Sequence, residues 1–382
     1  MRNDTRRLVR ALMSASVLLF ATTATWSQTL TWLGTLSNHY GHGSEALGVS
    51  ADGSVVVGRA THSSGETRAF RWTAGGGMQD LGTLGGNLSE AYGVSADGSV
   101  VVGRAASTPS QVHAFRWTAG GGMQALGSPT AFGLTANGVS ADGSVTVGNA
   151  ITGYWQFEGF HWTAGDGMQI LNLPHNGMMS GANGVSADGS VVVGSVTDSS
   201  WQTRAFRWTA GGGMQDLGTL GGSLSEAYGV SADGSTTVGY SHNSTGQVRA
   251  FRWTQATGMQ DLGTLGGESK ALSASGDGSV VVGYSTYAGH PAHRAFRWTQ
   301  ATGLQDLNIA YASLLTPYSY LSQANAISPN GRYIVGVGYN AAAGRSEAFL
   351  LDTMNPVPEP ASLIALGAGL AGLVGLRRRK QA

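Results

Sequence analysis

The sequence predicts an all-β protein, a seven-bladed β-propeller, and three observations support that fold class. A unit of about 45 residues recurs seven times, with the same three short markers in each copy. Glycine-rich turns divide each copy into four short strands, which is the signature of a propeller. The chain also begins with one isolated marker that the last copy lacks, so the N-terminal strand is expected to complete the last blade and close the ring.

The composition fits a turn-rich β protein with a core. Glycine supplies 60 of the 382 residues, hydrophobic residues make up 41% of the chain, and cysteine is absent. The hydrophobic content argues against disorder, and the absence of cysteine excludes disulfides, thiolate metal sites and cysteine nucleophiles. Eight of the 22 basic residues and two of the 22 acidic residues lie at the two ends, so the body between them carries a net charge of about −6. Nucleic acid is therefore not an expected partner.

Residues 1–28 have the three-part pattern of a secretory signal peptide. Four arginines lie in the first ten residues, the mostly apolar run ALMSASVLLFATTA follows, and polar TWSQT ends the segment. The apolar run is too short for a membrane anchor that stays in place, so export with cleavage near residues 24–28 is expected.

Internal repetition governs residues 29–353. The first marker, GVSADGS or a relative of it, places its acid or amide at Asp52, Asp97, Asp142, Asp188, Asp233, Asp277 and Asn330. The second, AFRWT or a relative of it, places its phenylalanine at Phe70, Phe115, Phe160, Phe206, Phe251, Phe296 and Phe349. The third, LGTL or a relative of it, begins at Leu33, Leu81, Leu126, Leu171, Leu217, Leu262 and Leu307. A linear β-solenoid is the alternative fold, but it does not explain the complementary ends.

The copy at residues 92–136 shows how each unit is expected to fold. Valine-rich and aromatic runs alternate with glycine turns, which predicts strands at residues 92–96, 99–105, 113–118 and 123–127. Asp97 and Gly98 are expected to form a two-residue hairpin turn, because both tolerate positive φ. The recurring aspartates are therefore assigned to turns, with a calcium ring as the alternative.

Two sets of third-strand residues recur in register and are expected to be structural. The tryptophans are assigned to the core: Trp72, Trp117, Trp162, Trp208, Trp253 and Trp298. The arginines that precede five of them are expected to pair with acids of adjacent blades, such as Asp80 or Asp216: Arg71, Arg116, Arg207, Arg252 and Arg297.

Residues 354–382 have the pattern of a second targeting signal. NPVPEP is followed by 16 uncharged residues, 361–376, and then by the cations RRRK. A helix over 361–376 rises about 24 Å, which makes it a marginal transmembrane span with a cytoplasmic basic end. The segment closely resembles the PEP-CTERM sorting signal of Gram-negative bacteria in its Pro-Glu-Pro, short helix and basic end: Pro358, Glu359, Pro360, Arg377, Arg378 and Arg379.

The two resemblances imply where the protein works. A PEP-CTERM signal implies secretion, recognition by an exosortase, a transient tether to the inner membrane, and delivery to the cell surface or the extracellular polysaccharide matrix. The repeats resemble the HAF family of bacterial extracellular repeats, with His/Arg-Ala-Phe at residues 68–70, 113–115, 204–206, 249–251 and 294–296. The HAF resemblance supports export and repeat architecture, and it implies no reaction.

The variable loops contain the candidate ligand-binding residues. Propeller connectivity places the loops between the second and third strands, and those between units, on one face, here called the variable face. Flat aromatic side chains among hydroxyl and amide residues suit stacking on sugars; the candidates are Tyr154, Trp155, Phe157, Trp201, Tyr287, Tyr318 and Tyr320. The alternative is that these aromatics pack between blades or are exposed without a ligand.

The sequence therefore predicts a non-enzymatic, exported surface or matrix protein that binds or scaffolds glycans such as exopolysaccharide. No catalytic residue, metal or cofactor is predicted, because GxSxG, HExxH and Walker spacings do not occur. One alternative is a secreted carbohydrate-active hydrolase or lyase, in which hydrolysis would need two well-placed carboxylates. The other is a protein-binding adhesion module.

Overall fold

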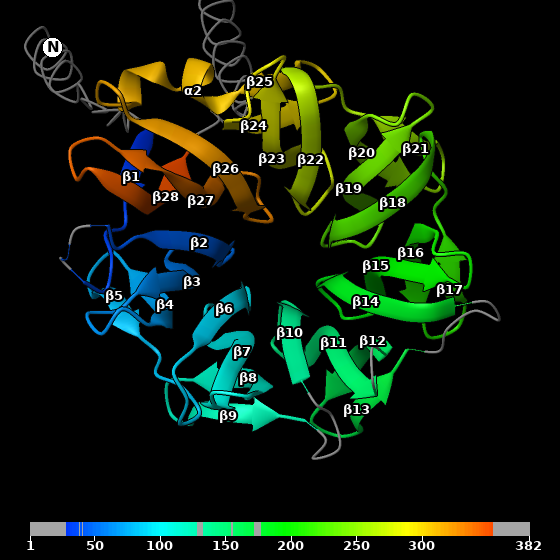
Figure 1. Cartoon of the computed structure of the whole chain (residues 1–382), viewed down its shortest axis with the longest axis horizontal. Helices are drawn as coiled ribbons and strands as arrows, with labels where there is room; N and C mark the ends of the chain where they lie inside the picture. Colours follow the sequence, from blue (N-terminus) through cyan, green and yellow to red (C-terminus); the bar gives the residue numbers. More distant parts are fainter. Residues whose placement is uncertain are drawn as a thin grey trace, which may run out of the picture. The chain divides into compact units, whose positions relative to one another are not determined.

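The computed structural model describes residues 28–353 except 38, 40, 128–132, 154–155 and 172–176, so the predicted signal peptide and sorting signal lie outside the described residues. The strands form five four-stranded sheets and one eight-stranded sheet, in which the single parallel pair Gly133–Val112 joins two units of four strands. Figure 1 shows these units arranged around a central axis. The all-β, propeller-like architecture predicted from the sequence is confirmed.

Each repeat unit starts with a strand next to the axis. In the first unit, buried and partly exposed residues alternate along this strand. Most of the buried positions carry serine, alanine or glycine, which lets neighbouring units approach closely. These first strands are β2 (Ser44–Val49), β6 (Ser89–Val94), β10 (Gly133–Val139), β14 (Gly177–Val185), β18 (Gly221–Val230), β22 (Gly266–Ala274) and β26 (Tyr320–Ile327).

The second strand of most units begins with a run of β-branched residues, typical of a strand covered on both faces. These strands are β3 (Val55–Thr61), β7 (Val100–Thr108), β11 (Val145–Gly153), β15 (Val191–Asp198), β19 (Thr236–Asn243), β23 (Val280–Tyr287) and β27 (Tyr333–Asn340). The third strands are β4 (Thr67–Thr73), β8 (Gln111–Thr118), β12 (Gln156–Thr163), β16 (Thr203–Thr209), β20 (Val248–Thr254), β24 (His293–Thr299) and β28 (Arg345–Asp352).

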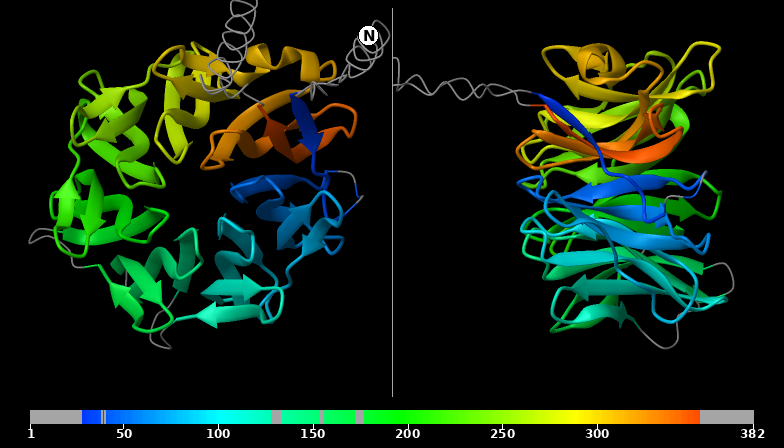
Figure 2. Two further views of the ribbon diagram at one scale, coloured as in Figure 1. Left: turned by 180° about the vertical axis from the view of Figure 1, so that it is seen from behind. Right: turned by 90° about the vertical axis from the view of Figure 1, so that its left-hand side faces the viewer.

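The fourth, outer strands are short: β5 (Gly77–Asp80), β9 (Gly122–Leu126), β13 (Gly167–Ile170), β17 (Gly213–Asp216), β21 (Gly258–Asp261) and β25 (Gly303–Asp306). In the last unit this place is taken by β1 (Thr29–Trp32), which pairs antiparallel with β28. Figure 2 shows β1, in dark blue, beside the orange strands of that unit. The short helix α2 (Leu307–Ala310) and the 3₁₀ turn Ala312–Leu314 follow β25.

The hydrophobic core consists of clusters that lie between neighbouring units. All seven repeated phenylalanines are fully buried. In one cluster Val57 of the first unit packs with Val101 and Phe115 of the second. A glycine in each second strand makes room for the first strand and the phenylalanine of its own unit: a Cβ on Gly103 would lie 1.9 Å from the Glu90 carbonyl oxygen. Three of the repeated tryptophans are buried, and the other three are half-buried against these clusters: Trp72, Trp162 and Trp208.

The turn after each first strand differs from the two-residue hairpin predicted. The Gly98 N–H donates to the Ser95 carbonyl at 2.9 Å, so Ala96 and Asp97 are the central residues, and of the turn only Gly98 has positive φ. The Asp97 carboxylate accepts from the Ser95 hydroxyl at 2.6 Å and from the Ser99 N–H at 3.0 Å. Aspartate is therefore used for its side-chain hydrogen bonds and not for a left-handed conformation.

These turns predict a loss of stability in acid. Hydrogen bonds from the preceding serine hydroxyl and the following serine N–H lower the pKa of Asp97, Asp142 and Asp188 from 3.8 to about 2. Because their folded-state pKa is depressed, these carboxylates stabilise the fold above about pH 3.8, and that contribution is lost as the pH falls towards 2.

A triple Asp→Asn variant at these three turns tests the prediction, since Asn330 already accepts the equivalent hydrogen bonds in the last unit. Urea unfolding should give the variant a lower free energy of unfolding than the wild type at pH 7. This difference in free energy should become smaller between pH 4 and pH 2. A difference that does not change with pH would contradict this explanation.

The same turns are linked around the axis by hydrogen bonds. From Ala51 to Ala232, the alanine N–H of one turn donates to the alanine carbonyl of the next at 2.9 to 3.0 Å. The links continue from the Asp233 N–H to the Gly276 carbonyl and from the Gly276 N–H to the Pro329 carbonyl. Proline has no N–H to donate. The Asn330 side-chain amide donates instead to the Ala51 carbonyl, at 3.2 Å.

The predicted pairs between third-strand arginines and acids of adjacent blades are wrong. Asp80 lies opposite Phe70 in the ladder, so its side chain is on the face opposite that of Arg71. Asp80 instead lies 3.9 Å from Arg68, two residues before Phe70. Asp216 accepts from the Gly218 N–H. Arg252 donates to a turn carbonyl of the next unit, Gly278, at 3.0 Å.

Candidate functional site

Two exposed aromatic residues on the variable face have a strained backbone. Trp201 and Tyr318 are the non-glycine residues with positive φ among those that the structure describes, with φ of 60° and 68°. Their exposed fractions are 71% and 91%. A left-handed conformation costs a bulky residue about 1–2 kcal/mol, so both positions display an aromatic side chain at the expense of stability.

Sister loops show that the strain at Trp201 comes from the side chain. The N–H of Trp201 closes its turn on the Asp198 carbonyl at 3.0 Å, and that of Gly246 closes the equivalent turn on Asn243 at 2.9 Å. Gly65 occupies the same place in the first unit, and both glycines have positive φ. The repeat therefore favours glycine here, and tryptophan replaces it in one unit.

Tyr318 occupies a comparable position in another turn. The Ser319 N–H donates to the Thr316 carbonyl at 3.0 Å, which places Pro317 and Tyr318 at the centre of a four-residue turn. Proline followed by a residue with positive φ is the pattern of a type II turn, in which glycine normally takes the second central place.

Tyr287 and Tyr320 belong to one group over the last two units. The Tyr287 hydroxyl donates to Asp306 Oδ2 at 2.8 Å, which raises the pKa of Tyr287. The Arg294 guanidinium lies 5.4 Å from the centre of the Tyr320 ring, which stacks on Tyr339 at 5.8 Å. Tyr287 and Tyr320 are each 37% exposed, so this aromatic surface remains open to a ligand.

A groove lies beside Tyr287, between the fifth and sixth units. It has a volume of about 550 Å³ and is lined by loop and strand-end residues that include Gln247, Glu268, Tyr287, His290 and His293. The Glu268 N–H donates a hydrogen bond to the Thr286 hydroxyl at 3.0 Å. The lining therefore combines an aromatic ring with amide, imidazole and carboxylate groups. Histidines, aspartates and glutamates in the described chain form no group of three or more that could hold a metal ion.

The structure brings together only part of the predicted set. Tyr287 and Tyr320 share one surface through Arg294, and Tyr318 lies just before β26. Trp201 and Phe157 belong to the fourth and third units, and Phe157 is 39% exposed on β12. Tyr154 and Trp155 lie outside the described residues.

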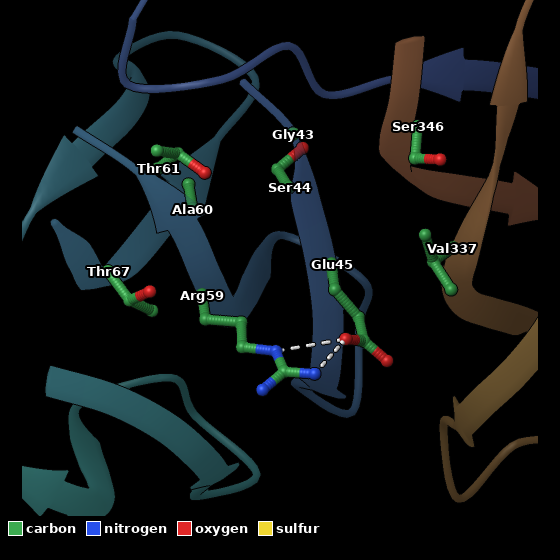
Figure 3. Close-up of a pocket in the computed structure, with 9 residues that line it drawn as sticks. All are labelled: Gly43, Ser44, Glu45, Arg59, Ala60, Thr61, Thr67, Val337 and Ser346. Atoms are coloured by element: carbon green, nitrogen blue, oxygen red, sulfur yellow. Dashed lines mark hydrogen bonds and ion pairs between the residues drawn. The ribbon is translucent and has the colours of Figure 1, made fainter. Parts of the chain in front are cut away.

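A charged group on the first and second strands of the first two units was missed by sequence reasoning. Glu90 is 2% exposed, and its carboxylate accepts from Arg59 Nη1 at 2.7 Å, Arg104 Nε at 2.5 Å and the Tyr92 hydroxyl at 2.5 Å. Arg59 also pairs with Glu45 at 2.7 Å, in a pocket of about 250 Å³ between the first and last units (Figure 3). The alternation of charged and small residues in the first strands was the available signal.

The corresponding group of the fifth unit is aromatic. Glu226 accepts from the hydroxyls of Tyr240, at 3.1 Å, and Tyr228, at 3.4 Å. Burial, together with the Glu226 charge, raises the pKa of Tyr240 to about 12. Lys270 Nζ lies 4.0 Å from the centre of the Tyr240 ring. Further along the first strands, a cavity of about 210 Å³ is lined by valines of successive units, among them Val49, Val94 and Val139.

One family model matches the end of the chain. Residues 356–380 match the PEP-CTERM protein-sorting motif, which identifies an exported protein with a C-terminal sorting signal for processing by an exosortase. A comparison with curated proteins finds no match. No helix of the described chain is long and apolar enough to cross a membrane, and the predicted span at 361–376 lies outside the described residues.

Several solved structures share the fold at low identity. The chain is similar to an oligogalacturonate lyase from Vibrio parahaemolyticus, with a TM-score of 0.57 and 12% identity over 86% of this chain and 94% of that one. It is also similar to a manganese complex of oligogalacturonate lyase, with a TM-score of 0.56 and 13% identity over the same shares of the two chains. The similarity to puromycin hydrolase has a TM-score of 0.53 and 16% identity, over 83% of this chain and 55% of that one. At these identities the similarity shows the fold alone.

Proposed function

We propose that this chain is an exosortase-sorted surface or matrix protein, a closed seven-bladed propeller of HAF-type repeats that binds glycans. Three contacts support closure of the ring. β1 completes the last unit, Asn330 links the last turn to Ala51, and Val335 of the last unit packs with Phe70 of the first. The Ala-Phe of the HAF pattern lies at the centre of each third strand that carries it.

The strained aromatics carry the proposal of glycan binding. Trp201 and Tyr318 lie on loops where a left-handed backbone favours glycine, yet each displays a large ring to solvent. Flat apolar rings with polar neighbours suit the faces and hydroxyls of sugars. Because the two residues belong to different units, a long polysaccharide, rather than a single sugar, can contact both.

The residues that line the groove favour glycan binding over glycoside hydrolysis. Glycoside hydrolysis generally uses two carboxyl groups about 5 to 10 Å apart. Glu268 is the one carboxylate among the described residues that line the groove. After export, the sorting signal is expected to tether the chain transiently to the inner membrane, and processing would deliver the body to the cell surface or its polysaccharide matrix.

Trp201→Gly and Tyr318→Gly test the proposal with the full-length chain purified in detergent. Each variant is expected to lose at least about tenfold in affinity for exopolysaccharide on a glycan array, because a stacking ring is removed. Each should also gain about 1 kcal/mol in stability, since glycine relieves the strain, and Tm should rise by about 2 °C.

Trp201→Phe is the matched control, since it retains both an aromatic ring and the strained backbone. It should bind glycan and show no gain in Tm. Unchanged glycan binding in both glycine variants would overturn the proposal, and release of shortened oligosaccharides by the wild type would favour an enzyme instead. Binding to surface proteins without glycans would favour the adhesion module.

A further inference from the structure

The arginine that begins the Arg-Ala-Phe pattern recurs in four units, as Arg68, Arg204, Arg249 and Arg294. In three of them the guanidinium has partners. Arg204 donates to the Ser223 carbonyl at 2.6 Å and to Gln202 Oε1 at 2.8 Å. Arg249 repeats both contacts with Gly267 and Gln247, and Arg68 pairs with Glu66.

Arg294 has lost the equivalent partners. Two residues before it, Ala292 replaces the glutamine or glutamate of the other units. The acid that ends the fourth strand, Asp306, is occupied: Oδ2 accepts from the Tyr287 hydroxyl, and Oδ1 from the Asn308 N–H and side-chain amide at 2.8 Å. Within the described part of the chain, the guanidinium of Arg294 makes neither a hydrogen bond nor an ion pair.

The surroundings of Arg294 fit an acidic sugar. Its guanidinium lies over Tyr320, and the hydroxyl of Tyr287, at the end of the adjoining strand β23, donates a hydrogen bond to Asp306. A guanidinium on an aromatic ring keeps its charge and can present two parallel N–H groups to an oxyanion. The neighbouring tyrosine rings can contact the sugar that carries that oxyanion.

We propose that Arg294 is a specificity determinant that selects glycans with an anionic group, a uronate carboxylate or a sulfate ester. The proposal rests on the proposed glycan-binding function and adds the class of ligand. The body carries a net charge of about −6, so non-specific attraction would not select such a polymer. Selection therefore depends on a local cation without an acid partner.

The test compares binding of alginate, dextran sulfate and neutral dextran to the full-length chain. Arg294→Gln should weaken binding of the anionic polymer by about 10- to 100-fold, as loss of a charged hydrogen-bond pair predicts, and leave dextran binding unchanged. Ala292→Gln keeps the charge but restores the partner found in two sister units, so it should also weaken anionic binding. Arg68→Gln removes a paired arginine elsewhere and should have no effect on binding.

The two anionic polymers show which anionic group is recognised. If alginate binding depends on Arg294, the group is a carboxylate; if dextran sulfate binding depends on Arg294, it is a sulfate ester. Anionic binding that survives Arg294→Gln, or equal affinity for dextran and both anionic polymers, would overturn the inference while leaving glycan binding intact. Failure to bind any glycan, including the array's exopolysaccharides, would overturn both proposals.

Discussion

Deletion of residues 29–32 is expected to destabilise the folded chain more than any other change considered. The four residues of β1 pair with β28 from Thr29–Asp352 to Trp32–Phe349. The half-buried Leu30 and Trp32 pack against the cluster that contains Phe349. Loss of the indole alone costs about 2–3 kcal/mol, against a typical total stability of about 5–15 kcal/mol. The deletion also exposes β28 as an edge that can pair with other chains.

Thermal unfolding and size-exclusion chromatography measure the result. The deleted protein should melt well below the wild type and form oligomers, and a peptide of residues 28–35 added in trans should restore both properties. The variant with Thr29→Ala and Thr31→Ala is the control, because it changes only exposed side chains of β1. A deleted protein that remains monomeric and melts within a few degrees of the wild type would show that β1 is dispensable.

Replacing Glu90 with alanine is expected to destabilise the protein by about 3 kcal/mol, the low end for breaking a buried ion pair. The change removes the acceptor of Arg59, Arg104 and Tyr92. Both arginine side chains are more than one-third exposed, so water can hydrate part of the charge that is left. Glu226→Ala, at the same repeat position, should cost about 1 kcal/mol, because within the described residues Glu226 accepts only from tyrosine hydroxyls.

The effect of Glu90→Ala should depend on pH. Burial raises the pKa of Glu90, but hydrogen bonds from Tyr92 and Arg59 and the charge of Arg104 outweigh it, so the net shift is downwards. The carboxylate therefore stabilises the fold above its ordinary pKa of 4.5, and this contribution is lost as the pH falls through the lower folded-state value. Urea unfolding at pH 7 and at pH 3 measures the free energy of unfolding of the wild type and the variant. The difference between the two proteins should be smaller at pH 3. An equal difference in unfolding free energy at the two pH values would show that Glu90→Ala destabilises the protein through lost packing alone.

The repeat, the strand order and the turn residues could be predicted because their signals are local. Ser95, Asp97 and Ser99 bond within five residues, and the repeated phenylalanine follows its turn by 18 positions in five units and by 19 in the last two. The hairpin geometry was nevertheless wrong, since Asp97 acts through its side chain. Sequence spacing shows which residues can meet in a turn, but not which of them takes the left-handed conformation.

The candidate site was predicted less well, because its contacts join distant residues. Tyr287 and Tyr320 were selected as aromatics, but their association through Arg294 depends on packing of the sixth unit against the seventh. Glu90 and Arg59 are 31 positions apart and meet only where the first strand of the second unit packs against the second strand of the first unit. The strain at Trp201 has a sequence signal, since Gly65 and Gly246 hold the same position in sister loops.

The sequence by itself determined the class of architecture, through seven copies of one unit, and the export of the chain, through the motif at residues 356–380. Both are repeated or contiguous patterns that need no third dimension to be recognised. Only the tertiary structure decided which charged groups have partners. Arg249 and Arg294 occupy the same place in nearly identical strands, yet one is held by Gln247 and Gly267 while the other lies over Tyr320. That difference arises because Ala292 stands where Arg249 has Gln247, and because the residues that each guanidinium meets in the next unit are not repeated.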